Sequence, residues 1–418
     1  MSEWREVRFN DVIDLNPKVK LEKGKDYPFV GIADIDESNY YVNERQTVRF
    51  TGQSGSKFHS DDTLFSRITP CLENRKIAQS ILKSENKGFG STELLVFRAK
   101  ENKTDPNFVN YLAQTDIIVL PAINSMSGAS GRQRANSNFI KKLKISIPDL
   151  DTQKKISNVL SSYDKLIENN NSRIEVLEQT AEEIYKEWFV RMRFPGYEQT
   201  KFDKGIPEGW KVKKVEDIIS FDIGGGWGEE ELLDDFNQPA YVIRGTDIPD
   251  MKYGIVNDEL LRFHKESNLK NRILKDSDII FEASGGSKDQ RLGRTYYVTD
   301  ELLSMFDNDV ICASFCKVIR IDDKEMSWYF NHYLRNSYKI ELLSIFEVQS
   351  TGISNFGFAK FKKHHSILIP NRELINLFYE KTYCMYLEIQ KLGKQNQNLK
   401  KQRDMLLPRF MNGTIEVK

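Results

Sequence analysis

One long helical stripe, present twice, constrains the fold of this chain more than any other feature. Between Thr152 and Phe189 the apolar residues recur at alternating steps of four and three, and neither Pro nor Gly interrupts them. The stripe consists of Ile156, Leu160, Tyr163, Ile167, Asn170, Ile174, Leu177, Ala181, Ile184 and Trp188, with Asn170 as its polar member. This spacing predicts a coiled-coil seam on one continuous helix.

A copy of the stripe lies 222 positions later in the sequence. Its members are Phe378, Met385, Ile389, Leu392, Asn396, Leu399, Leu406 and Phe410, with Thr382 and Arg403 as further polar positions. An amphipathic helix often packs only on its own domain, and that alternative stays open. Because both stripes follow a segment of domain size, we expect them to face each other as well.

The expected pairing of the two helices is antiparallel. If the residue numbers of facing residues sum to 566, every seam position has a partner: Ile174 faces Leu392, and Trp188 faces Phe378. The same register places Asn170 opposite Asn396, so that each amide can satisfy the other. A slip by one heptad would leave both amides buried alone.

The repeat extends beyond the helices. Trp4 to Ile13 matches Trp210 to Ile219 at an offset of 206, YPFVGIADI matches YVIRGTDI at 214, and DTLF matches DIIF at 216. From Val96 and Val318 onward the offset stays at 222. Each half therefore consists of a globular domain, a strand, a Pro and a long helix. We expect a first domain at 1–150, a helix at 151–190, a connector at 191–208, a second domain at 209–371, a helix at 372–412 and a tail at 413–418.

Short strand-like runs mixed with a helix, as at 107–115, predict that each domain is α/β or α+β. Two such domains, joined by two long helices in an antiparallel coiled coil, would form a dumbbell with pseudo-two-fold symmetry.

Composition excludes several classes of protein. Lys and Arg together number 61, as do Asp and Glu, so that net charge gives no argument for or against nucleic acid and any basic surface must be local. The four cysteines lack the density of a disulfide framework and the spacing of a zinc site. The N-terminus lacks the apolar run of a signal peptide, and no apolar stretch is long enough to cross a bilayer, so we expect a soluble, cytoplasmic protein.

No catalytic or metal-binding motif emerges. The GGGWG run at 224–228 lacks the GxxxxGKS ending of a phosphate loop, and we interpret it as a turn or a close backbone approach. None of the five histidines stands in a metal-binding or nucleophile-base motif, and Cys312 and Cys316 are most simply core residues. The chain also lacks a methyl-donor-binding loop and an Asn-Pro-Pro-aromatic stretch. We therefore expect no metal, no bound cofactor and no catalysis by this chain alone.

Local basic and hydrogen-bonding clusters occur at matching places in the two halves. These side-chain types grip phosphates and read base edges, although a solvated loop is the alternative for any one cluster. The candidate DNA-binding residues are Arg67, Arg75, Lys76, Arg132, Gln133 and Arg134 in the first half and Lys288, Arg291, Arg294, Gln349, Thr351 and Asn355 in the second.

The architecture and several local runs resemble the specificity (S) subunit of type I restriction-modification enzymes, over essentially the whole chain. The resemblance rests on EGW at the start of the second domain, DDTLFSR, DSDIIFEAS, SGASGRQRANSNFIKKLKISIPDLDTQKKI and KKQRDMLLPRFMNGTI. The second copy departs from the pattern at its helix entry, where Pro370-Asn371-Arg372-Glu373 lacks the Gln found at Gln153.

The resemblance implies a non-catalytic subunit with two target-recognition domains, each of which reads one half of a split, asymmetric DNA target, and two spacer helices that hold the halves apart. Its partners would be double-stranded DNA, two modification subunits that methylate adenine, and restriction subunits. S-adenosylmethionine, ATP and Mg would be bound by those partners. A duplicated coiled-coil adaptor that binds only proteins is the main alternative, and a stand-alone methyltransferase is disfavoured by the missing motifs.

Overall fold

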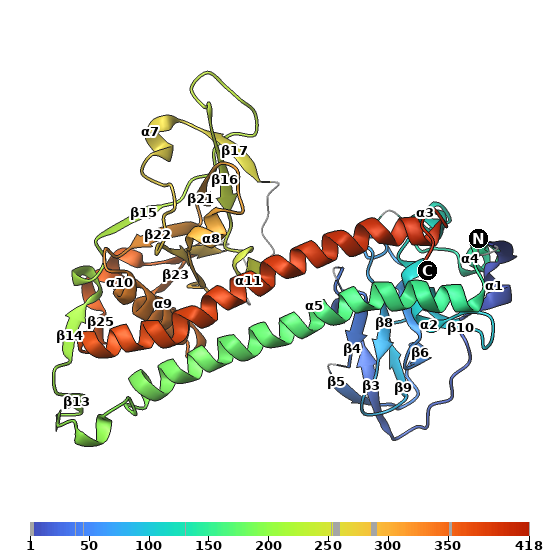
Figure 1. Ribbon diagram of the computed structural model, residues 1–418, viewed down its shortest axis with the longest axis horizontal. Coiled ribbons are helices and arrows are strands. Elements are labelled where there is room, and N and C mark those ends of the chain that lie inside the picture. The colour runs from blue at the N-terminus through green and yellow to red at the C-terminus, as the bar shows by residue number, and fades with distance from the viewer. Residues whose placement is uncertain are drawn as a thin grey trace. The chain divides into compact units, whose positions relative to one another are not determined.

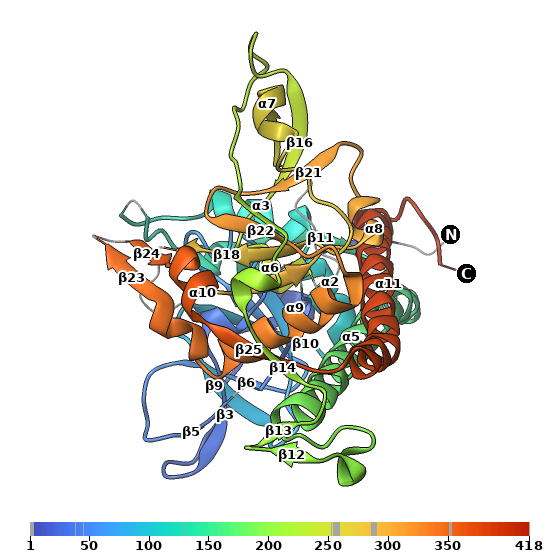
Figure 2. The same cartoon turned by 90° about the vertical axis from the view of Figure 1, so that its left-hand side faces the viewer.

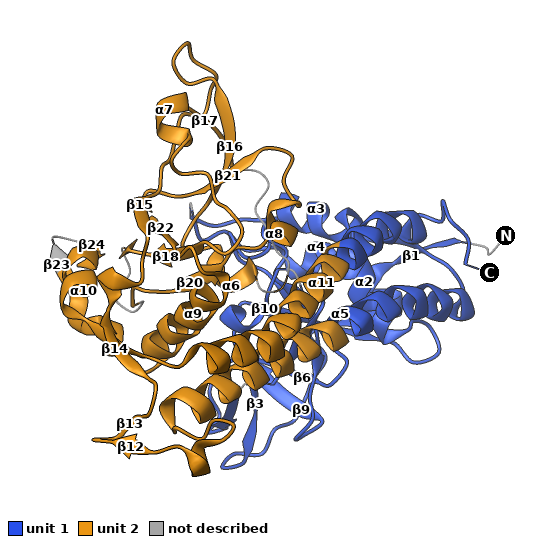
Figure 3. Ribbon diagram, turned by 60° about the vertical axis from the view of Figure 1, so that its left-hand side comes forward, with its two compact units in different colours: residues 1–167, 398–418 blue, residues 168–397 orange. Residues whose placement is uncertain are grey.

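The computed structural model describes residues 4–37, 39–44, 46–129, 131–251, 253, 260–285, 291–350 and 353–417, with only the backbone at 349, 350 and 353. The chain forms two compact units (Figure 3). Unit 1 comprises residues 1–167 and 398–418, and unit 2 comprises residues 168–397. Each unit thus includes parts of both long helices.

Unit 1 has two sheets and a separate strand pair. The first sheet has the order β2-β10-β7-β8-β4, the second has the order β5-β3-β9-β6, and β1 pairs with β11. The strands are β1 (Arg5–Arg8), β2 (Ile13–Leu15), β3 (Asp26–Val30), β4 (Tyr41–Asn43), β5 (Gln46–Arg49), β6 (Ser56–His59), β7 (Thr63–Ser66), β8 (Ile77–Ile81), β9 (Lys87–Gly90), β10 (Leu94–Ala99) and β11 (Lys144–Ile147). The short helices are α1 (Phe9–Val12), α2 (Pro106–Ala113), α3 (Asp116–Asn124) and α4 (Ser137–Lys142).

Unit 2 repeats much of this arrangement. Its sheets have the orders β15-β22-β18-β20, β17-β16-β21 and β19-β24-β23, and the pairs β14-β25 and β12-β13 complete it. The strands are β12 (Phe202–Asp203), β13 (Ile206–Pro207), β14 (Lys211–Lys214), β15 (Phe221–Gly224), β16 (Gln238–Ile243), β17 (Leu261–His264), β18 (Ile279–Glu282), β19 (Ser284–Gly285), β20 (Thr295–Tyr297), β21 (Asp309–Cys312), β22 (Cys316–Arg320), β23 (Glu347–Ser350), β24 (Ile353–Phe356) and β25 (Ser366–Ile369). The helices are α6 (Ile248–Met251), α7 (Glu266–Leu269), α8 (Asp300–Leu303), α9 (Lys324–Lys339) and α10 (Phe358–His364).

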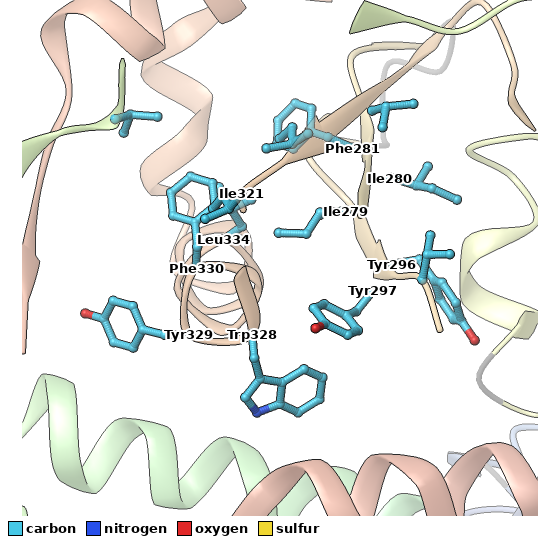
Figure 4. Packing of buried hydrophobic residues seen from close by; sticks show 14 of the residues in the cluster. Ile279, Ile280, Phe281, Tyr296, Tyr297, Ile321, Trp328, Tyr329, Phe330 and Leu334 are labelled. Atoms are coloured by element: carbon cyan, nitrogen blue, oxygen red, sulfur yellow. The ribbon is translucent and has the colours of Figure 1, made fainter. Parts of the chain in front are cut away.

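The core of unit 2 lies between its sheets and α9. Ile279, Ile280 and Phe281 of β18 are fully buried, in one cluster with aromatic side chains of β20 and α9 (Figure 4). The hairpin β16-β17 and helix α7 lie on the side of β18 and β22 that is away from α9 (Figure 2). Unit 2 therefore has one face built on the long helices and another that carries loops and the hairpin.

Strand register confirms the internal repeat. Leu95 of β10 pairs with Phe65 of β7, and Lys317 of β22 pairs with Phe281 of β18, which reproduces the offsets of 222 and 216. A buried ion pair is repeated in the same frame, because Arg98 binds Asp62 at 2.5 and 2.7 Å and Arg320 binds Asp278 at 2.6 and 2.7 Å. The two halves share a framework down to individual side chains.

One expected alignment is wrong by a residue. The Gly31 amide binds the Asp34 carboxylate, and the equivalent bond in unit 2 runs from the Arg244 amide to Asp247. The structural offset is therefore 213, and Gly31 corresponds to Arg244 rather than to Gly245. The capping carboxylates, Asp34 and Asp247, occupy equivalent positions in the two units, whereas the glycines Gly31 and Gly245 do not.

Both long helices form as expected. Helix α5 (Leu150–Tyr185) continues into a π-helical turn at Lys186–Val190, and α11 covers Arg372–Met411. The departure from the family pattern at Asn371 does not prevent helix entry, because the Asn371 side chain accepts a hydrogen bond from the Leu374 amide at 2.9 Å. Asp149 does the same for Thr152 at 2.8 Å. A capping residue thus begins each helix at equivalent positions.

The antiparallel register is confirmed in unit 2. In unit 2 the two helices lie side by side (Figure 1), with Asn170 bound to Asn396 at 3.0 Å and the rings of Trp188 and Phe378 6.1 Å apart. In unit 1, Ile156 and Leu160 share a buried cluster with Phe410. The register set by a residue-number sum of 566 therefore holds at the Asn pair and at Trp188.

The seam differs from the expected one at four positions. Tyr163, Ile184, Met385 and Leu406 are half-buried, and their neighbours Asp164, Tyr185, Tyr386 and Leu407 are buried instead. Asp164 turns inward because its carboxylate binds the buried Arg403 guanidinium, and Tyr386 turns toward its own domain to donate to the Tyr297 carbonyl. The helices therefore pack on their domains as well as on each other, so both readings of the stripes hold.

Candidate nucleic-acid interface

In unit 1, the polar loop at 126–136 lies against the end of β7. The backbone of Arg134 forms isolated antiparallel β-bridges with Ser127 and with Ile68. The Thr69 amide donates to the Gln133 carbonyl at 3.0 Å. The Ala135 amide donates to the Arg67 carbonyl at 2.7 Å. Backbone hydrogen bonds therefore bring the first predicted cluster, after DTLF, together with the second, before the helix.

Arg134 anchors this loop. Its Nε lies 2.9 Å and its Nη2 2.5 Å from the two oxygens of Glu93, a bidentate ion pair. Hydrogen bonding from Arg134 lowers the pKa of the Glu93 carboxyl from its usual value. Because its guanidinium is committed to Glu93, Arg134 positions the loop rather than offering free donors to a ligand.

Arg132 and Gln133 are exposed on the loop, and Arg67 is half-buried beneath it. Among the described residues, neither Arg67 nor Arg132 has a carboxylate within ion-pair distance, and Arg67 Nε is buried without a hydrogen bond. These three side chains and the backbone that holds them form the basic surface of unit 1, which can donate to phosphate oxygens or base edges.

Arg75 has a different role. Its guanidinium donates to the Gln114 carbonyl and pairs with Asp116 on α3, so it ties the turn before β8 to the helices. Lys76, next in the chain, is half-buried just ahead of β8. The structure therefore does not place Arg75 among the loop residues at 132–134.

The candidate DNA-binding residues of the second half are only partly described by the structure. Arg291 pairs with Glu341 at 2.7 Å, and Arg294 binds both oxygens of Glu282 at 2.5 and 2.7 Å. Asn355 is exposed and accepts a hydrogen bond from the Ser284 hydroxyl at 2.7 Å. Lys288 and Thr351 lie outside the described residues, and for Gln349 only the backbone, paired with Ser354, is described.

Sequence reasoning missed a cavity in unit 2. It has a volume of about 580 Å³ and is lined by Trp227, Arg244, Gly245, Thr246, Glu282, Ser284, Gly285, Leu292, Arg294, Ala313, Ser314 and Phe315. We call it the Trp227 cavity. The available signal was the GGGWG run, which we interpreted only as a turn or close approach.

The close approach is confirmed at Gly225. A Cβ there would lie 2.2 Å from the carbonyl oxygens of both Cys312 and Ala313, so only glycine fits without movement. Cys312 and Cys316 are buried core residues, as expected, and burial raises the pKa of the Cys316 thiol to about 12. The glycines thus let the backbone that carries Trp227 run against strands β21 and β22.

Within the described ranges, no three His, Cys, Asp or Glu side chains are grouped so that they could hold a metal ion. Over the same ranges, no helix combines the length and apolarity that membrane crossing requires.

Comparison with known proteins agrees with this architecture. The model of the type I restriction modification DNA specificity domain matches residues 1–179. The chain is 26% identical to the type I restriction enzyme MjaIX specificity subunit of Methanocaldococcus jannaschii over 71% of this chain and 66% of that protein. It is 21% identical to the HindI specificity subunit of Haemophilus influenzae over 99% of this chain and all of that protein.

A solved structure has the same fold. The type I restriction-modification system S subunit from M. genitalium aligns over 98% of this chain and 96% of its own, with a TM-score of 0.56 at 15% identity. This chain has mixed α/β units and two long helices, and its match to that S subunit confirms the expected fold class. Residues 1–179 match the type I restriction modification DNA specificity domain, and the chain is similar in sequence and fold to type I restriction-modification specificity subunits.

Proposed function

We propose that this chain reads a bipartite, asymmetric DNA target, with the domain at 1–150 on one half-site and the domain at 209–371 on the other. The helices at 151–190 and 372–412 would serve as spacers, the segment at 191–208 as the connector and 413–418 as the tail. Two modification subunits, and restriction subunits where present, would assemble on it and carry S-adenosylmethionine, ATP and Mg. The chain itself would bind none of these cofactors.

The observation that carries the proposal is a repeated framework with unlike loop surfaces. The ion pairs Asp62–Arg98 and Asp278–Arg320 have the same geometry. At the place where unit 1 has Glu93 bound to Arg134, unit 2 has the exposed ring of Phe315. Two readers built on one scaffold but lined by different side chains are expected to recognise different sequences.

The candidate contacts differ in how directly they would act. Arg132 and Gln133 are exposed, and Arg67 has unused donors, so these three are the strongest candidates in unit 1. Arg134, Arg291 and Arg294 would act mainly through the loops they tie down, because each is engaged by a carboxylate. Lys76, Arg75, Lys288, Gln349, Thr351 and Asn355 remain candidates from sequence alone.

The test is to co-express the chain with its modification subunits and map methylated adenines across the host genome. Substituting Arg132 and Gln133 by Ala should relax one half-site and leave the other unchanged, with a loss of about 1–3 kcal/mol per base contact. Arg49→Ala is the matched control, because Arg49 is an exposed arginine of unit 1 that pairs with Asp26 on the neighbouring strand. Equal relaxation at both halves would contradict independent readers.

A coiled-coil adaptor that binds only proteins is the alternative. Phosphate contacts release counterions, so specific DNA binding by this chain should weaken steeply with salt. Affinity for duplex that does not change between 50 and 200 mM salt, or no preference for any duplex sequence, would favour the adaptor.

A further inference from the structure

The Trp227 cavity is built by two backbones that hydrogen-bond to each other. The Gly225 amide donates to the Cys316 carbonyl and the Gly226 amide to the Cys312 carbonyl, both at 2.9 Å. Trp227 follows the first backbone and Phe315 belongs to the second. Both rings line the cavity although they remain 42% and 56% exposed.

Two large aromatic rings at the wall of an open cavity are costly to leave in water. The guanidinium of Arg262 lies over the Trp227 ring, 5.5 Å from its centroid, which restrains the ring from one side. Phe315 is held by its own carbonyl, which accepts from the Ala283 and Ser284 amides at 2.8 and 3.0 Å. The backbone at Phe315 is therefore held in place, and the Trp227 ring is held on one side by Arg262.

The lining also contains a charged pair. Glu282 and Arg294 are 7% and 14% exposed at their side chains and bind each other through both carboxylate oxygens. A carboxylate has about four acceptor sites, so Glu282 retains acceptor capacity beyond the two bonds to Arg294. Ser284 and Arg244 also line the cavity, with the Ser284 hydroxyl donating to Asn355 and the Arg244 guanidinium paired with Asp247.

This combination suits a planar heteroaromatic ligand. The volume of about 580 Å³ falls in the range of small-molecule sites, which join apolar walls with a few polar groups. A nucleobase has faces that stack on Trp and Phe, and amino groups that donate to a carboxylate. Neither an aliphatic ligand nor a bare phosphate would use both features.

The first half does not repeat the site. Strand register places Ser66 where unit 2 has Glu282, and Glu93 where it has Phe315. In unit 1 the Glu93 carboxylate is bound by Arg134, so a salt bridge occupies the position of the aromatic wall. A shared structural requirement of the fold would appear in both halves, whereas a ligand site of the second reader need not.

We propose that the Trp227 cavity binds one nucleobase, stacked on Trp227 or Phe315 with its hydrogen-bonding edge toward Glu282. The base comes either from DNA, as a nucleotide turned out of the duplex, or from a free nucleotide. The DNA source rests on the proposed function, and the free-nucleotide source does not. Turning out a base costs a few kcal/mol, which stacking on an aromatic ring offsets.

The test uses the full chain with two probes. The first is the duplex target found by methylation mapping, intact or with a single abasic site at each position of the half-site read by residues 209–371. The second is the set of four deoxynucleoside monophosphates, followed by tryptophan fluorescence. The variants are Trp227→Ala, Phe315→Ala and Trp227→Phe, with Phe202→Ala as an exposed aromatic control outside the cavity. Thermal unfolding checks that each variant is folded.

For a base from DNA, Trp227→Ala should weaken duplex binding about 5- to 150-fold, as expected for one stacked base, and Trp227→Phe should restore most of it. One abasic position should cost the wild type a similar factor and cost Trp227→Ala nothing further. For a free nucleotide, binding of a monophosphate should depend on Trp227 while duplex affinity stays constant.

If the folded Trp227→Ala and Phe315→Ala variants bind the duplex and the monophosphates as the wild type does, the nucleobase site is rejected while the proposed function stands. If the wild type binds no duplex, the proposed function fails, and the monophosphate titration alone decides the nucleobase site: binding that depends on Trp227 keeps it, and no binding rejects it.

Discussion

The side-chain amide of Asn170 donates a hydrogen bond to the side-chain carbonyl of Asn396, 3.0 Å away across the helix pair. Asn396 in turn donates to the Asn171 side chain at 2.8 Å. Asn170 and Asn396 are 6% and 2% exposed, so neither amide has water to replace its partner. Each other register would leave at least one of them unsatisfied.

Replacing Asn170 alone by Leu should destabilise unit 2 by about 1–3 kcal/mol, because Asn396 is left buried without its donor. The double replacement of Asn170 and Asn396 by Leu should recover most of this loss, since neither polar group then remains. Denaturant unfolding followed by circular dichroism measures both effects. The exposed neighbour Asn169, changed to Leu, should have little effect, and an equal loss in that control would show that the hydrogen bond is not the cause.

The ion pair of Arg403 with Asp164 closes the seam in unit 1. Both side chains are almost fully buried, and the Asp164 carboxylate also accepts from the Tyr111 hydroxyl. Arg403→Met should cost about 3–5 kcal/mol, because it leaves an uncompensated buried carboxylate. Adding Asp164→Leu to that variant should restore stability, whereas the exposed Arg409→Met should be close to neutral. A double variant no more stable than Arg403→Met would contradict this account.

Gly224 and Gly225 offer a matched pair of substitutions. A Cβ at Gly224 meets nothing within 4 Å, and one at Gly225 meets two carbonyl oxygens at 2.2 Å. Gly224→Ala should therefore be tolerated, while Gly225→Ala should cost about 1–3 kcal/mol and shift the tryptophan emission as Trp227 moves. Equal unfolding temperatures for the two variants would show that the backbone approach at Gly225 is not tight.

The pairing of Glu93 with Arg134 predicts a pH dependence. Because hydrogen bonding to Arg134 lowers the pKa of Glu93 in the folded chain, its stabilising effect is complete above the unfolded value near 4.5 and is lost as pH falls through the lower, folded value. Arg134→Gln should move the Glu93 titration midpoint, measured by carbon NMR, upward toward 4.5. A midpoint that does not change would mean that Arg134 does not hold the carboxylate in solution.

Sequence periodicity predicted the helices, their register and the duplicated framework, because these depend on spacing that a linear pattern preserves. Periodicity gave the wrong residue where a single side-chain contact determines the alignment or the buried position. The cap at Asp247 shifted the repeat by one residue, and the carboxylate of Asp164 displaced Tyr163 from the seam. A stripe of apolar residues does not reveal which buried cation will require a partner.

The candidate site was predictable only in part. The loop at 132–134 and the end of β7 were both expected to be basic, yet their backbone contact depends on strand pairing that the sequence does not display. The sequence could not show which arginines form ion pairs, because Glu93 and Glu282 lie 41 and 12 positions from the arginines they bind. The Trp227 cavity could not be predicted, because a GGGWG run shows neither which backbone lies against it nor how much space is left beside that backbone.

The make-up of unit 1 has a consequence for synthesis on the ribosome. Its residues 1–167 are made first, but 398–418 follow only after about 230 intervening residues, which takes roughly 10–50 s at ordinary elongation rates. During that interval Asp164, Ile156 and Leu160 lack Arg403 and Phe410, so the seam on the nascent helix is exposed to water and to other chains. Other nascent chains on the same messenger RNA expose the same seam and can pair with it. Misassembly between chains is therefore expected mainly during this interval.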